Sequence, residues 1–206
     1  MSMLSLLFPA LNKLDSGGLP VWLNHDSPWE IFSEHEENLM SQIIKLTGST
    51  DSSFIHPSAK IGKYVEIENP CFIGENVTIR HSALLRRGSW ICDGSVVGHS
   101  SEIKNSILLP GSNAPHFNYV GDSIIGTGVN LGAGVIISNV RNDRRSILLT
   151  DQNGIRINSG LRKLGALIGD GAQIGCNTVS NPGTIVCPNV MISPNSTLGG
   201  WIASQE

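Results

Sequence analysis

The sequence is poor in aromatic and charged residues and contains no long hydrophobic run. Aromatic residues make up 5% of its 206 residues and charged residues 15%, whereas about 25% of an average globular chain is charged. No apolar segment reaches the roughly 18 residues of a membrane-spanning helix, and residues 1–9 lack the basic start of a signal peptide. The sequence therefore predicts a cytoplasmic protein without a membrane partner.

Cysteine spacing and net charge argue against a disulfide-rich protein, a cysteine-based metal protein and a nucleic-acid-binding protein. Cys71, Cys92, Cys176 and Cys187 are scattered without CxxC spacing, so we expect neither a disulfide framework nor a metal site built on them. A net charge of −3 provides no field that attracts nucleic acid. A hydrophobic content of 40% argues against disorder, and 23 glycines indicate many tight turns between short strands.

What the sequence does contain is a period of six. An aliphatic residue recurs at every sixth position over ten consecutive repeats: Ile55, Ile61, Ile67, Ile73, Ile79, Leu85, Ile91, Val97, Ile103 and Leu109. The pattern resumes at Ile125, Leu131 and Ile137, and again at Ile168, Ile174, Ser180, Val186, Ile192 and Leu198, where only Ser180 is not aliphatic. Neither a helix nor a simple alternating strand produces this period.

A period of six with a turn in each unit predicts short strands joined by corners. Three such sides make one coil of 18 residues, and successive coils stack as parallel strands about 4.8 Å apart. The repeated aliphatic residues then fill the interior in columns, one of which holds Ile55, Ile73, Ile91 and Leu109. We predict an all-β triangular β-helix over residues 54–200.

Residues 1–53 precede this domain as an N-terminal extension. Ser27, Pro28 and Glu30 have the pattern of a helix start with a capping box. We predict an α-helix over about 28–46, ended by Gly48, followed by a polar linker over 49–53. Residues 1–26 show a Gly17-Gly18 turn and no clear period.

The repeat breaks twice, and register breaks in a solenoid favour function. The first break runs from Pro110 to Asp122 and contains His116. The second, an inserted loop over about 138–164, is rich in arginine and lysine. Within it, Asn153-Gly154 lies between two strand-like segments and predicts a basic β-hairpin that projects from the coil; a solvated decorative loop is the alternative.

The 18-residue spacing also aligns polar side chains on the outside. Glu68, Arg86 and Lys104 each follow an interior aliphatic residue and are predicted to form one vertical ladder. Stacked cations repel each other unless an anion binds against them, so we favour a phosphate site here; the alternative is that Glu68 neutralises Arg86 while Lys104 faces water. Glu102 is expected to accept a hydrogen bond from His116, leaving the other ring nitrogen as a base.

Four segments, in order and at matching separations, resemble the acetyltransferase domain of the bifunctional enzymes that make UDP-N-acetylglucosamine. They are Arg86-Arg87-Gly88, residues 98–104, residues 116–122 and residues 130–134. Residues 159–170 are similar to related sugar-phosphate nucleotidylyltransferases with a β-helix tail. The resemblance covers about residues 54–200, and it implies a left-handed coil, which the period alone does not specify because parallel crossovers are usually right-handed.

The resemblance also implies a reaction and its residues. The chain is expected to transfer an acetyl group from acetyl-CoA to an amino-sugar 1-phosphate such as glucosamine 1-phosphate, as a homotrimer and without a metal requirement. His116 is the implied general base, and Glu102 orients it. The implied substrate-binding residues are Arg86, Lys104, Tyr119, Asn130, Asn139 and Arg145, and the implied coenzyme-binding residues are Ala133 and Cys176.

The sequence departs from the family pattern at several of these positions. Val140 replaces an aromatic residue, Arg145 a lysine, Cys176 a serine and Pro194 an alanine. No nucleotidylyltransferase half and little of the family's C-terminal arm are expected in this sequence, so a separate nucleotidylyltransferase is an expected partner. Two other interpretations stay open: a non-catalytic trimeric scaffold, and a metal enzyme that uses the stacked pair His81 and His99.

Overall fold

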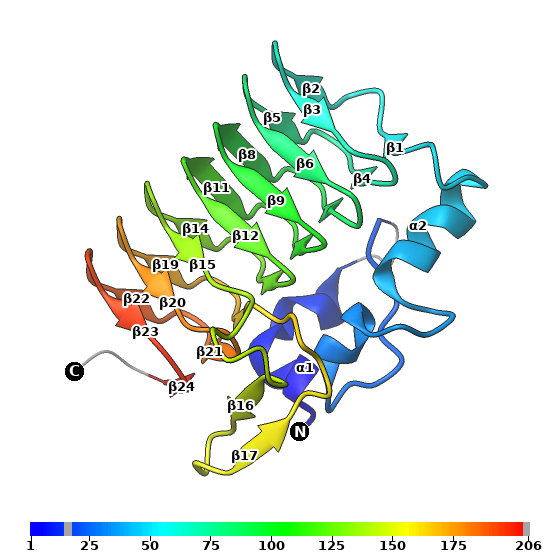
Figure 1. Cartoon of the computed structure of the whole chain (residues 1–206). Helices are drawn as coiled ribbons and strands as arrows, with labels where there is room; N and C mark the ends of the chain where they lie inside the picture. Colours follow the sequence, from blue (N-terminus) through cyan, green and yellow to red (C-terminus); the bar gives the residue numbers. More distant parts are fainter. Residues whose placement is uncertain (15–17, 204–206) are drawn as a thin grey trace.

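A computed structural model describes residues 1–14 and 18–203 and shows a triangular column of stacked coils. Three parallel sheets form its sides (Figure 1), and we name them sheets A, B and C in the order in which the chain visits them. Sheet A holds β1 (Phe54–Ile55), β4 (Phe72–Ile73), β7 (Trp90–Ile91), β10 (Ile107–Leu108), β13 (Ile124–Ile125), β18 (Ala166–Ile168), β21 (Thr184–Val186) and β24 (Trp201–Ile202).

The other two sheets continue each coil. Sheet B holds β2 (Lys60–Ile61), β5 (Thr78–Ile79), β8 (Val96–His99), β11 (Asn113–His116), β14 (Asn130–Leu131), β19 (Gln173–Ile174) and β22 (Met191–Ile192). Sheet C holds β3 (Glu66–Ile67), β6 (Leu84–Arg86), β9 (Glu102–Lys104), β12 (Tyr119–Gly121), β15 (Ile136–Ile137), β20 (Val179–Ser180) and β23 (Thr197–Leu198). The predicted parallel β-helix is confirmed, and its left hand remains an expectation from the resemblance.

The repeated residues are buried from Ile73 onward as predicted, while Ile55 and Ile61 on the first coil are exposed; one position of the interior column also needs correction. Ile55 pairs with Ile73 and Ile73 with Ile91, but the next member of this column is Leu108, not Leu109. Leu109 is fully buried in a second apolar cluster outside the coil. The prediction was wrong there because it assumed that the coil after Ile91 keeps 18 residues.

The register therefore shifts at two corners between sheets C and A, the first lying before the predicted break of Pro110–Asp122 and the second at its end. Leu108 pairs with Ile91 and Ile125 with Leu108, so two successive coils hold 17 residues each. The missing residue is at the corner that follows Lys104 and again at the one that follows Gly121. Asn105 and Asp122 make these tight corners with φ of 44° and 48°, a left-handed conformation that asparagine and aspartate tolerate better than most residues.

A second apolar core covers the outer face of sheet A. Four helices of the N-terminal extension contribute to it: α1 (Met3–Leu7), the 3₁₀ helices η1 (Pro9–Lys13) and η2 (Pro28–Phe32), and α2 (Leu39–Thr47). Figure 1 shows these segments alongside the sheet A edge of the column. Trp90 Nε1 donates to the Gly18 carbonyl at 2.8 Å, and the Asp170 carboxylate accepts from the Ala10 and Thr127 amides at 2.8 and 2.7 Å.

The single α-helix predicted over 28–46 does not form. The 3₁₀ helix η2 ends at Phe32, and α2 begins only at Leu39, where the Asn38 side chain caps it by accepting from the Ser41 amide. Residues 33–38 carry no apolar side chain and three glutamates, so a helix through them has nothing to bury. Gly48 ends α2 in the left-handed conformation, as predicted.

The predicted hairpin is present in the second break. Antiparallel strands β16 (Leu148–Thr150) and β17 (Arg156–Asn158) flank a turn in which Gly154 has φ 79°. The hairpin is not a free projection, because Ile147, Leu149 and Leu164 are completely buried in the outer core. Within the described residues no helix is long and apolar enough to cross a bilayer.

Candidate functional site

The corner between sheets B and C carries a vertical column of side chains, one from each coil, that we call the corner column. Its members are Lys63, His81, His99, His116, Ala133, Cys176 and Pro194. Backbone hydrogen bonds fix the stacking: the Gly134 amide donates to the His116 carbonyl at 3.0 Å, and the Asn177 amide donates to the Ala133 carbonyl at 2.9 Å. The predicted base and the two predicted coenzyme residues therefore follow one another on successive coils.

Three imidazoles stack within this column. The ring centroids of His81 and His99 lie 5.3 Å apart and nearly parallel, as their spacing predicts. His116 meets His99 edge to face, also at 5.3 Å, and Phe117 meets His99 edge to face at 4.4 Å. The buried side chain of Asn118 accepts from the His116 amide at 3.0 Å, so both the backbone and the ring of His116 are held in place.

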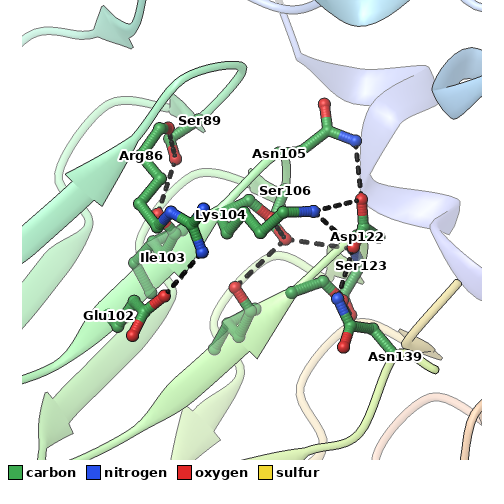
Figure 2. Close-up of polar contacts among 12 residues, drawn as sticks. Arg86, Ser89, Glu102, Ile103, Lys104, Asn105, Ser106, Asp122, Ser123 and Asn139 are labelled. Atoms are coloured by element: carbon green, nitrogen blue, oxygen red, sulfur yellow. Dashed lines mark hydrogen bonds and ion pairs between the residues drawn. The ribbon is translucent and has the colours of Figure 1, made fainter. Parts of the chain in front are cut away.

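The second group of polar residues lies on sheet C, near its corner with sheet A (Figure 2). Arg86 and Lys104 are paired in register, which confirms the predicted ladder. Arg86 Nη1 lies 3.1 Å from Glu102, and Arg86 Nε lies 3.5 Å from Glu68. These carboxylates raise the pKa of Arg86, chiefly through the hydrogen bond to Glu102.

Asp122 is the centre of this group. Its carboxylate is almost completely buried and accepts both hydrogen bonds of Lys104 Nζ, at 2.8 and 3.0 Å. It also accepts from the side-chain amides of Asn105, at 2.8 Å, and Asn139. Lys104 and Asn105 are neighbours at one corner, and Asn139 lies at the start of the insertion, so Asp122 joins two coils and the insertion.

Tyr119 completes the sheet C group. Its phenol is hydrogen-bonded with the Asn139 side chain, and burial raises its pKa, an effect that Glu102 and Asp122 reinforce by their negative charge. The hydroxyl and the Asn139 amide crowd the Cα of Gly121, where an added Cβ would lie 2.8 and 2.7 Å from them. The glycine at that position therefore makes room for the pair.

The structure brings together some of the predicted site residues and separates others. Arg86, Glu102, Lys104, Tyr119 and Asn139 share sheet C and its corner with sheet A, whereas His116, Ala133 and Cys176 share the corner column. Asn130 lies on sheet B in register with Asn113. Arg145 lies in the insertion, where it and Arg141 bind Asp143 and lower the pKa of that carboxyl.

The contacts of the single chain bear on two of the expectations, and one of them is wrong for the single chain. The Glu102 carboxylate accepts from Arg86 and, within the described residues, makes no hydrogen bond with His116. The phosphate site expected between Arg86 and Lys104 stays a prediction: in the single chain both cations are paired with carboxylates, those of Glu68, Glu102 and Asp122. Several carboxylates from neighbouring coils lie within reach of Arg86 and Lys104, and the sequence spacing does not predict which of them forms each ion pair.

Sequence reasoning missed Asp122, Asn105 and Asn118. Asp122 was in the resembling segment, but its position against Lys104 depends on the shortened corners, which the six-residue period conceals. Among the described residues no group of three or more histidine, cysteine, aspartate or glutamate side chains is placed to hold a metal ion. Of the four free thiols, Cys71 is buried, and burial raises its pKa to about 12, while Cys176 is exposed.

The coil and its motifs define a hexapeptide-repeat parallel β-helix. The chain is a homologue of bifunctional enzymes that combine nucleotidyl and acetyl transfer: it is 33% identical over 185 residues to "Bifunctional sugar-1-phosphate nucleotidylyltransferase/acetyltransferase" of Sulfurisphaera tokodaii. It is also 32% identical over 192 residues to "Bifunctional protein GlmU" of Methanococcus maripaludis. The resemblance predicted from the motifs is confirmed. These alignments cover 86% and 90% of this chain but only 46% of each relative, so the chain spans about half of their length.

Solved structures with a similar outline are more distant. The chain covers 67% of "LpxA, a UDP-N-acetylglucosamine acyltransferase" from Bacteroides fragilis, with 73% of its own length aligned, 19% identity and a TM-score of 0.44. It covers 56% of the acetyltransferase domain of PglB from Neisseria gonorrhoeae in complex with acetyl coenzyme A, with 79% of its own length aligned, 16% identity and a TM-score of 0.39. Scores this low carry no functional inference. No family model matches the chain.

Proposed function

We propose that the protein transfers the acetyl group of acetyl-CoA to the amine of an amino-sugar 1-phosphate of the glucosamine 1-phosphate type. The names of the sequence relatives, which pair acetyl transfer with sugar 1-phosphates, support this class of reaction. The observation that carries it is the corner column, in which His116, Ala133 and Cys176 follow one another on successive coils. The candidate base therefore lies on the coil next to the two residues proposed to line the coenzyme arm.

His116 is the proposed general base. The attacking amine must be neutral, and His116 takes the proton that the nitrogen loses as the N–C bond forms. The C–S bond of the thioester then breaks, and the proton passes to the coenzyme A sulfur. His99 packs edge to face against the imidazole, and Asn118 holds the His116 backbone in place for this transfer.

The proposed acceptor residues come mainly from sheet C. Tyr119 and Asn139 present a phenol and an amide to the sugar, and Arg86 and Lys104 are the proposed phosphate ligands. Because carboxylates hold both cations in the single chain, phosphate binding must displace Glu102 from Arg86, which frees Glu102 to approach the base. Asn130 and Arg145 are proposed to bind the substrate from sheet B and from the insertion. Ala133 and Cys176 are proposed to line the coenzyme arm. The complete site is proposed to form in a cytoplasmic homotrimer.

Release of coenzyme A tests the proposal directly. Purified protein is mixed with acetyl-CoA and glucosamine 1-phosphate, and free thiol is followed with a chromogenic disulfide. His116→Ala is expected to lower kcat by about 10²–10⁴-fold, the usual contribution of a positioned base. His25→Ala is the matched control, since His25 is an exposed histidine of the N-terminal extension and its loss should leave the rate unchanged.

The same experiment also distinguishes acetyl transfer from the main alternative, a non-catalytic scaffold. No thiol release from the folded wild-type protein with any of several amino-sugar phosphates would reject acetyl transfer and leave the non-catalytic scaffold. In that case the carboxylates on Arg86 and Lys104 would be permanent structural partners rather than ions that a substrate displaces. A separate nucleotidylyltransferase remains a proposed partner, to be sought by co-purification.

A further inference from the structure

A pocket of about 630 Å³ lies over the first two coils, at the far end of the corner column from Cys176. It is lined by Lys60, Ile61, Gly62, Lys63, Tyr64, Thr78, Ile79, Arg80 and His81. Its size falls within the range of sites for small organic ligands, about 300–1,000 Å³. The established resemblance and the proposed catalytic residues make no use of it.

The pocket is positively charged and its charges are uncompensated. Lys60, Lys63 and Arg80 are exposed and, within the described residues, form no ion pair or side-chain hydrogen bond; His81 only stacks on His99. No acidic residue lines the pocket. A phosphate group can bind here without displacing a carboxylate, whereas at Arg86 and Lys104 it competes with the carboxylates of Glu68, Glu102 and Asp122.

The pocket also offers an apolar surface suited to a ring. The Tyr64 side chain is 87% exposed, and Ile61, beside it, is 41% exposed. An exposed tyrosine at a basic site is a platform on which a nucleobase stacks, and stacking of this kind tolerates any base. Cations for a phosphate and an aromatic ring for a base thus occur together.

The distance between this pocket and His116 sets a minimum length for a ligand that reaches both. His81 lies two coils from His116 and Lys63 three coils, which is roughly 10–15 Å at about 4.8 Å per coil. In an amino-sugar 1-phosphate the amine and the phosphate are on adjacent carbons, so they span only about one coil spacing. A ligand whose amine reaches His116 and whose phosphates reach this pocket must therefore be longer than a sugar monophosphate.

We propose that the pocket of Lys60, Lys63, Tyr64, Arg80 and His81 binds a nucleoside diphosphate. The diphosphate lies against the lysines and Arg80, and the base stacks on Tyr64. The nucleoside diphosphate comes from one of two sources: it is the end of a nucleotide-linked amino sugar whose amine is acetylated at His116, or it is a free nucleotide that binds without being consumed. The first source rests on the proposed acetyl transfer, whereas binding itself does not.

Binding is measured by titration calorimetry of the full chain with UDP and, separately, with inorganic pyrophosphate. UDP is expected to bind more tightly than pyrophosphate, and Tyr64→Ala should remove that difference. The double variant Lys63→Ala/Arg80→Ala should weaken UDP binding at least about tenfold, since two charge-assisted contacts are lost. Lys13→Ala removes an exposed cation on η1 and is the control that should bind as wild type.

His116→Ala separates this inference from the proposed function. UDP binding that persists in His116→Ala and fails in Lys63→Ala/Arg80→Ala supports the pocket whether or not acetyl transfer occurs. The two sources are distinguished by thiol release: a UDP-linked amino sugar consumed faster by wild type than by the double variant identifies the acceptor, whereas competition by UDP without such turnover identifies the free nucleotide. No UDP binding, or equal binding by the double variant, would overturn the proposal.

Discussion

At the residue scale, the arrangement of sheet C depends on one buried carboxylate. Asp122 was not among the residues singled out for function, yet it accepts two hydrogen bonds from Lys104 Nζ and one from Asn139. Two of the residues proposed to bind substrate therefore take their positions from it. Their shared dependence on Asp122 explains how residues from two coils and an insertion present a single polar surface.

Removing this carboxylate is expected to destabilise the fold. Asp122→Ala leaves the Lys104 ammonium, with 18% of its side chain exposed, without its partner, and breaking such a pair costs about 3 kcal/mol. Urea unfolding measures the loss. The double variant Asp122→Ala/Lys104→Met should recover part of it, because no unpaired charge remains, while Asp26→Ala, on an exposed loop, should stay within about 0.5 kcal/mol of wild type. Equal stability of Asp122→Ala and wild type would show that Asp122 does not organise the group.

Tyr119 provides an optical test of the same environment. Burial and two nearby carboxylates raise its pKa, so the stability it contributes is complete below the unfolded value of about 10 and is lost as the pH rises through the higher folded value. The chain has two tyrosines. Tyrosinate absorbance at 295 nm should therefore include a late-titrating component that Tyr119→Phe removes and Tyr64→Phe leaves. A late-titrating component that persists in Tyr119→Phe would contradict the assignment.

At the element scale, the coil tolerates no side chain where two coils touch beneath the imidazoles. A Cβ on Gly98 would lie 1.5 Å from the Pro115 carbonyl oxygen, one residue from both His99 and His116. Gly98→Ala must therefore spread β8 and β11 apart, and we expect a loss of about 2–3 kcal/mol. Acetyl transfer should fall as well, because the base moves.

Gly199→Ala is the matched control for Gly98. Its added Cβ meets only the Asn181 side chain, with the amide nitrogen at 3.2 Å, so stability should change by no more than about 0.5 kcal/mol. Thermal unfolding and thiol release on both variants measure the two effects. Full activity in a destabilised Gly98→Ala protein would show that the contact between β8 and β11 at Gly98 does not set the position of His116.

The same elements show what a sequence can and cannot predict here. The six-residue period places nearly every strand, and Asn153-Gly154 places the hairpin, because both depend on local turn geometry and on which face of a strand is apolar. Leu109 is placed wrongly because a corner that loses one residue leaves no local signal beyond the aspartate and asparagine that make it. The ion-pair partners of Arg86 and Lys104 depend on which side chains of separate coils come closest, and the spacing of residues in the sequence does not predict this.

The N-terminal extension is the larger omission. Residues 1–26 have no period, and their role emerges only from packing: Leu7 and Phe8 are fully buried with Trp90 and Ile107 on the outer face of sheet A. The helix expected from Pro28 divides for a similar reason, because Ile31 and Leu39 have an apolar surface to cover and residues 33–38 have none. Tertiary contact overrides the local propensity in both places.

At the scale of the whole molecule, the packing of the N-terminal extension on sheet A leaves only the other sheets of the coil free for self-association. The extension and the hairpin occupy sheet A, so the homotrimer that the family resemblance implies must form through the other sheets. On sheet C, Ile136 and Val179 pair in register and are 37% and 40% exposed, directly beyond Tyr119. We expect a second copy to contact this apolar pair and thereby close the space beside Tyr119.

Light scattering on the intact chain tests this assembly. The wild-type protein is expected to have three times the mass of one chain, and Ile136→Lys should dissociate it, because a lysine at the centre of a packed contact must lose its water. Ile155→Lys, on the exposed turn of the hairpin, introduces the same charge away from sheet C and should leave the mass unchanged. If acetyl transfer needs the neighbouring subunit, Ile136→Lys also loses activity while its circular dichroism spectrum stays that of the folded coil. A monomeric wild type with full activity would instead show that one chain holds the complete site.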